Sequence, residues 1–123
     1  MRTVWIIDDD DEMSHAVKLM LGLLEYSAVI DRDARSAARR LDEGARPDLI
    51  LLDINMPEIT GIDFLEFLRI RSEYRNIPVV MLSSETTDVQ VDEAMDLGAD
   101  GFLFKPVTID ELEEVLNKVL ASI

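Results

Sequence analysis

Four consecutive apolar residues, Leu49 to Leu52, constrain the fold of this chain more than any other stretch. They are too few for a helix and are typical of a strand buried on both faces of a parallel sheet. The run ends at Asp53, so a carboxylate stands at the carboxyl end of a central strand, where open α/β sheets present their ligands. Pro57 and Gly61 then indicate a loop. Taken alone, Asp53 is equally compatible with a capping role in a turn.

The rest of the chain alternates apolar runs with helical patterns. Further strands are expected at about 3–7, 28–30, 79–82 and 101–104, and apolar residues at helical spacing predict helices at about 13–24, 34–43, 62–72, 87–97 and 108–119. Asp33 is a candidate N-cap, and Thr108-x-x-Glu111 matches a capping box. This alternation predicts an α/β fold, a doubly wound five-stranded parallel sheet in which all strand ends face one way.

The composition excludes several classes of protein. A chain of 123 residues is expected to form a single domain, residues 1–123, and without cysteine it has no disulfide, thiolate nucleophile or cysteine-based zinc site. No signal segment or membrane-spanning apolar run stands out, so we expect a cytoplasmic protein.

The net charge of −14 argues against direct nucleic-acid binding. Eight arginines lie between residues 32 and 75, and most of this stretch is expected to be solvated helix surface. His15, the only histidine, is expected to be a surface residue.

Polar residues follow four of the predicted strands. Asp8 and Asp9, Asp53, Ser83 and Lys105 are expected to meet at one edge of the sheet. Carboxylates this close raise each other's pKa unless a cation neutralises them, and Mg²⁺ suits oxygen ligands beside open solvent. An aspartate there could attack phosphorus and form an aspartyl phosphate, with Lys105 and Ser83 contacting phosphate oxygens.

Each of these residues also has a plainer interpretation. Asp8 to Asp11 would favour a helix N-terminus, Lys105 would neutralise them, and Ser83 would cap a turn. The five residues together at strand ends favour a site over these separate roles.

Four motifs in order and spacing resemble the receiver domain of two-component response regulators (the CheY-like family), over nearly the whole chain. They are Ile6–Asp9, Leu51–Pro57 with Gly61, Val80–Ser84 and Phe104–Pro106. The resemblance implies a flavodoxin-like (βα)5 fold with strand order 2-1-3-4-5. It also implies a phosphorelay role, in which Asp53 takes phosphate from the phosphohistidine of a sensor histidine kinase or phosphotransfer protein. Such a chain is not an enzyme, apart from catalysing its own phosphorylation and dephosphorylation.

The same resemblance assigns the ligands of Mg²⁺. Asp9, Asp53 and the backbone carbonyl of Asn55 would bind the ion directly, and Asp8 would bind it through water. It also implies a cis peptide bond between Lys105 and Pro106.

Four further positions bear on switching and on the lifetime of the phosphate. Ser83 stands where threonine is commoner in the family and keeps the hydroxyl. Phe102 stands where many members have tyrosine, so an aromatic switch here would depend on packing alone. Asn55 and Glu85 occupy positions that tune phosphate lifetime and match the chemotaxis regulator, so a short-lived phosphoryl group is expected.

The surface that carries the output in the family consists of the helix at 87–97, the strand at 101–104 and the last helix. Here it is acidic and suggests a basic protein partner, with Asp88, Asp92, Glu93, Asp96, Glu111, Glu113 and Glu114. A homodimer through this surface and a covalently linked output domain stay open.

Two other functions also stay open: a Mg²⁺-dependent aspartyl-phosphate phosphatase, for which Asp8-x-Asp10 gives a weak signal, and a receiver-like adaptor that is never phosphorylated.

Overall fold

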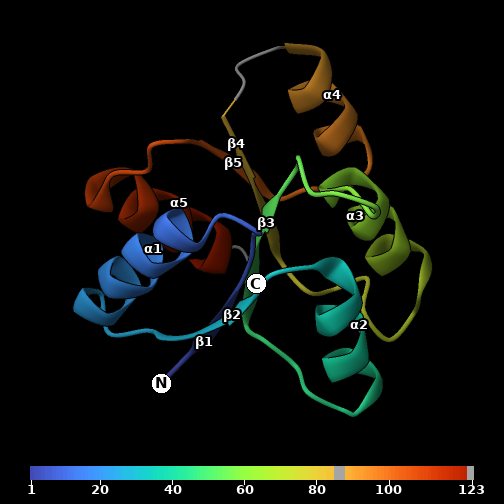
Figure 1. Cartoon of the computed structure of the whole chain (residues 1–123), viewed down its shortest axis with the longest axis horizontal. Helices are drawn as coiled ribbons and strands as arrows, with labels where there is room; N and C mark the ends of the chain where they lie inside the picture. The colour runs from blue at the N-terminus through green and yellow to red at the C-terminus, as the bar shows by residue number, and fades with distance from the viewer. Residues whose placement is uncertain (85–87, 122–123) are drawn as a thin grey trace.

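The computed structural model describes residues 1–84 and 88–121, which form a parallel sheet with helices on both faces (Figure 1). The strands are β1 (Thr3–Ile7), β2 (Ser27–Asp31), β3 (Leu49–Asp53), β4 (Val79–Ser83) and β5 (Gly101–Phe104), and the helices are α1 (Asp11–Leu23), α2 (Ala34–Asp42), α3 (Gly61–Ile70), α4 (Asp88–Asp96) and α5 (Ile109–Ala121). The strand order is β2-β1-β3-β4-β5, and every pairing is parallel. The doubly wound, flavodoxin-like topology is therefore confirmed.

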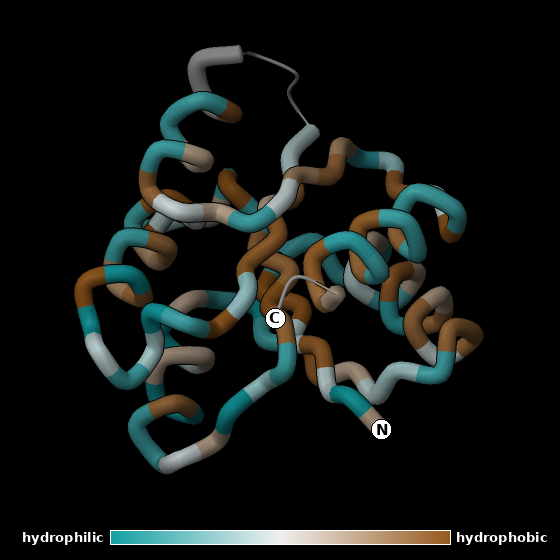
Figure 2. The backbone as a smooth tube through the Cα atoms, turned by 180° about the vertical axis from the view of Figure 1, so that it is seen from behind, coloured by the Kyte–Doolittle hydropathy of each residue, from teal (hydrophilic) through white to brown (hydrophobic). Residues whose placement is uncertain are grey.

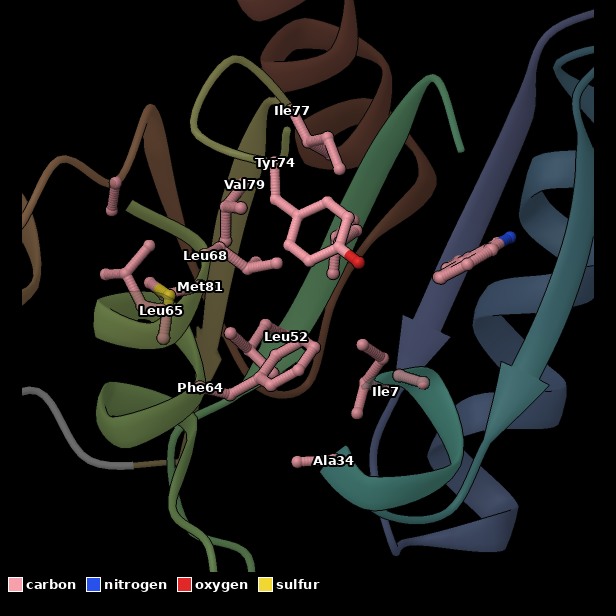
Figure 3. Close-up of a cluster of buried hydrophobic side chains, with 14 of the residues drawn as sticks. Ile7, Ala34, Leu52, Phe64, Leu65, Leu68, Tyr74, Ile77, Val79 and Met81 are labelled. Carbon is pink, nitrogen blue, oxygen red and sulfur yellow. The ribbon is translucent and has the colours of Figure 1, made fainter. Parts of the chain in front are cut away.

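Two apolar layers enclose the sheet. In Figure 1, α1 and α5 cover one face, while α2, α3 and α4 cover the other. Successive strand residues point to opposite faces, so Ile6 packs into the α1/α5 layer and Ile7 into the α2/α3/α4 layer. Figure 3 shows Phe64 and Leu68 of α3 beside strand residues of this second layer. All five residues of β3 and of β4 are buried, which accounts for their continuous apolar sequence and for the hydrophobic centre seen in Figure 2.

Side-chain caps fix where the helices begin. Asp10 accepts a hydrogen bond from the Met13 amide at 3.1 Å, so α1 starts two residues earlier than its apolar pattern indicates. The predicted Asp33 cap is confirmed by its bond to the Ser36 amide at 2.8 Å. The predicted capping box at Thr108 and Glu111 is also present.

A capping box that the sequence analysis missed opens α3. Thr60 Oγ1 accepts from the Asp63 amide at 3.2 Å, and an Asp63 carboxylate oxygen accepts from the Thr60 amide at 3.4 Å. Helix α3 consequently begins at Gly61, immediately after the loop that follows β3. The first residue expected for α4, at position 87, lies outside the described residues. None of the described helices combines the length and apolar character needed to cross a membrane.

Candidate functional site

The carboxylates of Asp8, Asp9 and Asp53 lie together at the carboxyl edge of the sheet. Strands β1 and β3 are neighbours, and Ile7 lies opposite Leu52. Asp8 and Asp53, which follow these two residues, therefore meet at this edge. Each of the three aspartates offers an oxygen, and these oxygens all lie within 4.8 Å of one another. Asp8 is completely buried and Asp53 is 4% exposed, whereas Asp9 is only partly buried. The predicted acidic cluster therefore forms, with one member open to solvent.

The ammonium group of Lys105 reaches this cluster from the end of β5. Its Nζ lies 2.8 Å from Asp8 Oδ2 and 3.5 Å from Asp53 Oδ1. The Lys105 amide donates to the Ser83 carbonyl at 2.8 Å, and the Lys105–Pro106 peptide bond is cis, as the family resemblance implies. The backbone of Lys105 thus pairs with the end of β4, while its side chain extends to the two buried carboxylates of Asp8 and Asp53.

Burial and charge set the protonation of the site. Burial and, next, the negative charge of Asp8 raise the pKa of Asp53 to about 7, although Lys105 opposes this. Burial lowers the pKa of Lys105, but the carboxylates of Asp8 and Asp53 outweigh it, and the net shift is upward. Lys105 is therefore charged at neutral pH. Its single positive charge does not fully compensate the two buried carboxylates of Asp8 and Asp53.

The remaining oxygens of the cluster suit a hard cation. Asp8 Oδ1 accepts from the Asp10 amide at 2.9 Å, and Asp53 Oδ1 accepts from the Asn55 amide at 3.3 Å. Asp8 Oδ2 has no hydrogen-bond partner among the described residues, apart from its ion-pair contact with Lys105. Oxygen ligands with uncompensated negative charge are what Mg²⁺ binds in proteins, so these residues fit that ion.

Other predicted site residues surround the cluster. Ser83 is fully buried, one residue beyond the register pair of Asp53 and Leu82. Asn55 is exposed in the loop after β3. Phe102 is partly buried, with its ring centroid 5.0 Å from that of the partly exposed Phe104. The structure places these residues around the acidic edge without assigning their roles, and Glu85 lies outside the described residues.

Two residues, Gly61 and Ser14, support this edge through contacts that the sequence did not predict. A Cβ added to Gly61 would overlap the carbonyl group of Asp53, and the Gly61 amide donates to the Ile54 carbonyl at 2.9 Å. Glycine is therefore needed for this close approach, beyond its role in the turn. The hydroxyl of buried Ser14 lies 3.5 Å from the Asp8 carbonyl and fastens α1 to the end of β1.

The surface interpretation of His15 agrees with the structure. Its side chain is exposed, and Nδ1 lies 2.7 Å from the Asp11 carbonyl one turn earlier in α1.

The chain is similar in sequence to known proteins. The family model of the response regulator receiver domain matches residues 4–117. Chemotaxis protein CheY1 of Helicobacter pylori is 30% identical over 118 residues, with 95% of each chain covered. The transcriptional regulatory protein CpxR of Escherichia coli is 32% identical over 120 residues, and the match covers 98% of this chain but 50% of CpxR.

Solved structures agree with these sequence matches. The structure of chemotaxis protein CheY4 of Vibrio cholerae has a TM-score of 0.89 to this fold and is 33% identical, with 97% of this chain and 98% of CheY4 covered. Since fold, sequence and family model agree along almost the entire length, this chain belongs to the CheY-like receiver domains of two-component response regulators.

Proposed function

We propose that Asp53 accepts a phosphoryl group from the phosphohistidine of a sensor histidine kinase or phosphotransfer protein. The single observation that carries this proposal is the placement of the Lys105 ammonium group within 3.5 Å of Asp53 and 2.8 Å of Asp8. Carboxylates are nucleophiles for phosphorus in several phosphoryl-transfer proteins, and such reactions depend on positioning and on charge neutralisation. Burial, neighbouring acids and a fixed ammonium group supply the setting for that chemistry.

Mg²⁺ is the cofactor that we assign to this site. Asp9, Asp53 and the backbone carbonyl of Asn55 would hold the ion directly, and Asp8 would hold it through water. A bound ion would supply positive charge to the phosphoryl oxygens and compensate the carboxylates that raise the pKa of Asp53.

The chain's own residues account for the transfer itself. A carboxylate oxygen of Asp53 attacks phosphorus, the phosphorus–nitrogen bond of the phosphohistidine breaks, and the imidazole nitrogen leaves with the electron pair. The Lys105 ammonium pairs with one phosphoryl oxygen and the Ser83 hydroxyl donates to another. The chain thus catalyses only its own phosphorylation and its later dephosphorylation.

The phosphoryl group would signal through β4 and β5. New charge-assisted bonds to Ser83 and Lys105 favour an alternative arrangement of these strand ends, and the partly buried ring of Phe102 moves by repacking. The readout is the face formed by α4, β5 and α5, which exposes the acids Asp92, Glu93, Asp96, Glu111, Glu113 and Glu114. A basic protein surface, either on a separate partner or on a linked output domain, complements this face, whereas the like charges oppose a homodimer through it.

We further infer that the phosphoryl group is short-lived. Asn55 is exposed two residues beyond the acceptor, at a position that tunes phosphate lifetime in the family. Glu85 occupies the second sequence position that tunes phosphate lifetime in the family, and it supports the same short lifetime. Timing the decay of the modification at neutral pH tests this inference, and a lifetime of many hours would contradict it.

A phosphorylation assay tests the main proposal. Acetyl phosphate with Mg²⁺ should add one phosphoryl group to the wild type and none to Asp53→Asn, measured by intact-protein mass. Beryllofluoride with Mg²⁺ should shift amide resonances near Asp53 only in the wild type. Steady turnover of an external phosphomonoester would favour the phosphatase instead, and no response to either reagent would favour the adaptor.

A further inference from the structure

A hollow of about 430 Å³ opens beside the acidic cluster. It lies between the ends of β1 and β2 and the loop after β3, and its lining includes Asp9, Arg32, Arg35 and Glu58. Asp9 connects it to the site, since its carboxylate lies within 4.8 Å of a carboxylate oxygen of Asp53. A small group attached to a phosphorus atom at Asp53 therefore has space on this side.

We propose that this hollow holds the leaving group of a small acyl phosphate donor, and that Arg32 and Arg35 neutralise the departing carboxylate. The inference rests on the proposed function, because it concerns the molecule from which Asp53 takes its phosphate. It adds to that function a subsite for the leaving group.

The charge distribution makes these arginines distinctive. The chain carries a net charge of −14, and an acidic run from Asp8 to Glu12 follows β1, so an anionic donor is repelled from most of this edge. The lining of the hollow is mixed, with the acids Asp9, Asp33 and Glu58 beside the two cations Arg32 and Arg35. These two arginines are the groups of the lining that can pair with an anionic donor.

Both arginines can exchange their present partners for a ligand. Arg32 Nε lies 3.0 Å from Asp11 Oδ1, with the two side chains 67% and 60% exposed. Arg35 Nη2 lies 3.6 Å from Glu58 Oε2, with the two side chains 69% and 71% exposed. Ion pairs this exposed contribute little stability, so a carboxylate entering the hollow can compete with them.

The chemistry of an acyl phosphate matches this placement. The Asp53 carboxylate attacks phosphorus, the bond between phosphorus and the acyl oxygen breaks, and the carboxylate leaves with the electron pair. Negative charge on that oxygen grows in the transition state, and a guanidinium group that pairs with it would stabilise the transition state more than the bound donor. The arginines should therefore act mainly on the rate of transfer.

A phosphoramidate donor provides the contrast. Its leaving group is ammonia, which carries no negative charge and gains nothing from a guanidinium group. Removing the arginines should then lower the rate with acetyl phosphate and leave the rate with phosphoramidate nearly unchanged.

The test compares Arg32→Gln, Arg35→Gln and the double variant with the wild type and with Arg39→Gln. Arg39 lies one turn after Arg35 on α2 and does not line the hollow, so its variant controls for the loss of one positive charge. The rate constants of Asp53 phosphorylation by both donors are measured with Mg²⁺ at fixed ionic strength. Beryllofluoride affinity is measured as well, because that anion brings no leaving group.

Each single substitution in the hollow should lower the ratio of the acetyl phosphate rate to the phosphoramidate rate about two- to fivefold, the size expected for one exposed charge interaction. Beryllofluoride affinity should stay at the wild-type value. An unchanged ratio, or an equal fall in Arg39→Gln, would overturn the subsite. A wild type that takes phosphate from neither donor but binds beryllofluoride would also overturn the subsite. A wild type that responds to neither donor nor beryllofluoride would instead overturn the proposed function itself.

Discussion

Lys105 Nζ lies closer to Asp8 than to Asp53, at 2.8 Å against 3.5 Å. The ammonium group is therefore held by a carboxylate that is not the proposed acceptor. A phosphoryl group on Asp53 would present new oxygens within the lysine's reach, while Asp8 keeps the side chain oriented beforehand. This pre-organisation avoids the entropy cost of ordering a long side chain during the reaction.

Replacing Lys105 with Met should expose how much the pair of buried carboxylates depends on this cation. Removing one partner of a buried ion pair leaves uncompensated charge, so we expect a loss of about 3 kcal/mol in the free energy of unfolding at about pH 8. The loss should shrink near pH 5, where Asp53 takes up a proton. Urea unfolding followed through the buried Trp5 measures both values, and an equal loss at the two pH values would contradict the electrostatic explanation.

The raised pKa of Asp53 predicts a specific pH dependence of stability. Its pKa is about 7 in the folded chain and near 3.8 when unperturbed, so the native state binds this proton more tightly than the unfolded state does. The resulting stabilisation is complete below about pH 4 and is lost as the pH rises to about 7. Asp53→Asn should remove this slope and be more stable than the wild type at neutral pH.

The measurement compares unfolding free energies of wild type and Asp53→Asn between about pH 5 and pH 8. Their difference should grow with pH and level off above about 7. Adding Mg²⁺ should raise the stability of the wild type at high pH and affect the variant less, since the proposed ion loses one of its ligands. A difference that does not vary with pH would contradict the raised pKa.

The substitution Gly61→Ala should damage the site through the backbone. Its new methyl group would overlap the Asp53 carbonyl, so we expect a loss of about 1–3 kcal/mol from overpacking and slower phosphorylation. Gly22→Ala is the matched control, because no atom lies within 4 Å of an added Cβ there and alanine favours helix α1, by about 0.5–1 kcal/mol. Unfolding curves and phosphorylation rates of both variants decide this, and a Gly61→Ala protein that behaves like the wild type would refute it.

How far the sequence predicts this site depends on the kind of signal. Asp53 and Lys105 were predictable because buried apolar runs mark the strands, and parallel topology brings strand ends to one edge. The consecutive acids after β1 were harder to separate. The family resemblance selects Asp8 and Asp9, and the structure adds that Asp8 is buried against the lysine whereas Asp10 caps α1.

Contacts between segments that are distant in the chain produce no local pattern in the sequence, so they could not be predicted from it. The need for glycine at 61 arises from a carbonyl eight residues earlier, and no turn rule predicts that overlap. The role of Asp31, at the end of β2, was likewise not predicted from the sequence. Asp31 is 5% exposed, and its Oδ1 accepts from Arg40 Nε at 3.0 Å, a pairing that depends on how α2 packs beside β2.

Arg69 provides the last prediction, because it fastens the end of the sheet opposite the acidic cluster. Its guanidinium donates to the carbonyls of Gly98 at 2.9 Å and Ile77 at 2.9 Å, and to Asp100 Oδ2 at 3.1 Å. Asp100 Oδ2 also accepts from the Val79 amide at 2.9 Å at the start of β4. One side chain thus joins α3 to the segments that lead into β4 and β5.

Burial lowers the pKa of Arg69, although Asp100 opposes this. The guanidinium group makes several directed hydrogen bonds at once, which no smaller group reproduces. Arg69→Lys keeps the charge but loses the planar fork, so we expect both Arg69→Lys and Arg69→Met to lose about 2–3 kcal/mol, from carbonyls left without donors. Arg75→Gln, at a nearby exposed position, should change stability by less than about 0.5 kcal/mol. Urea unfolding measures all three, and a full rescue by lysine would mean that the charge, rather than the geometry of the hydrogen bonds, holds these segments together.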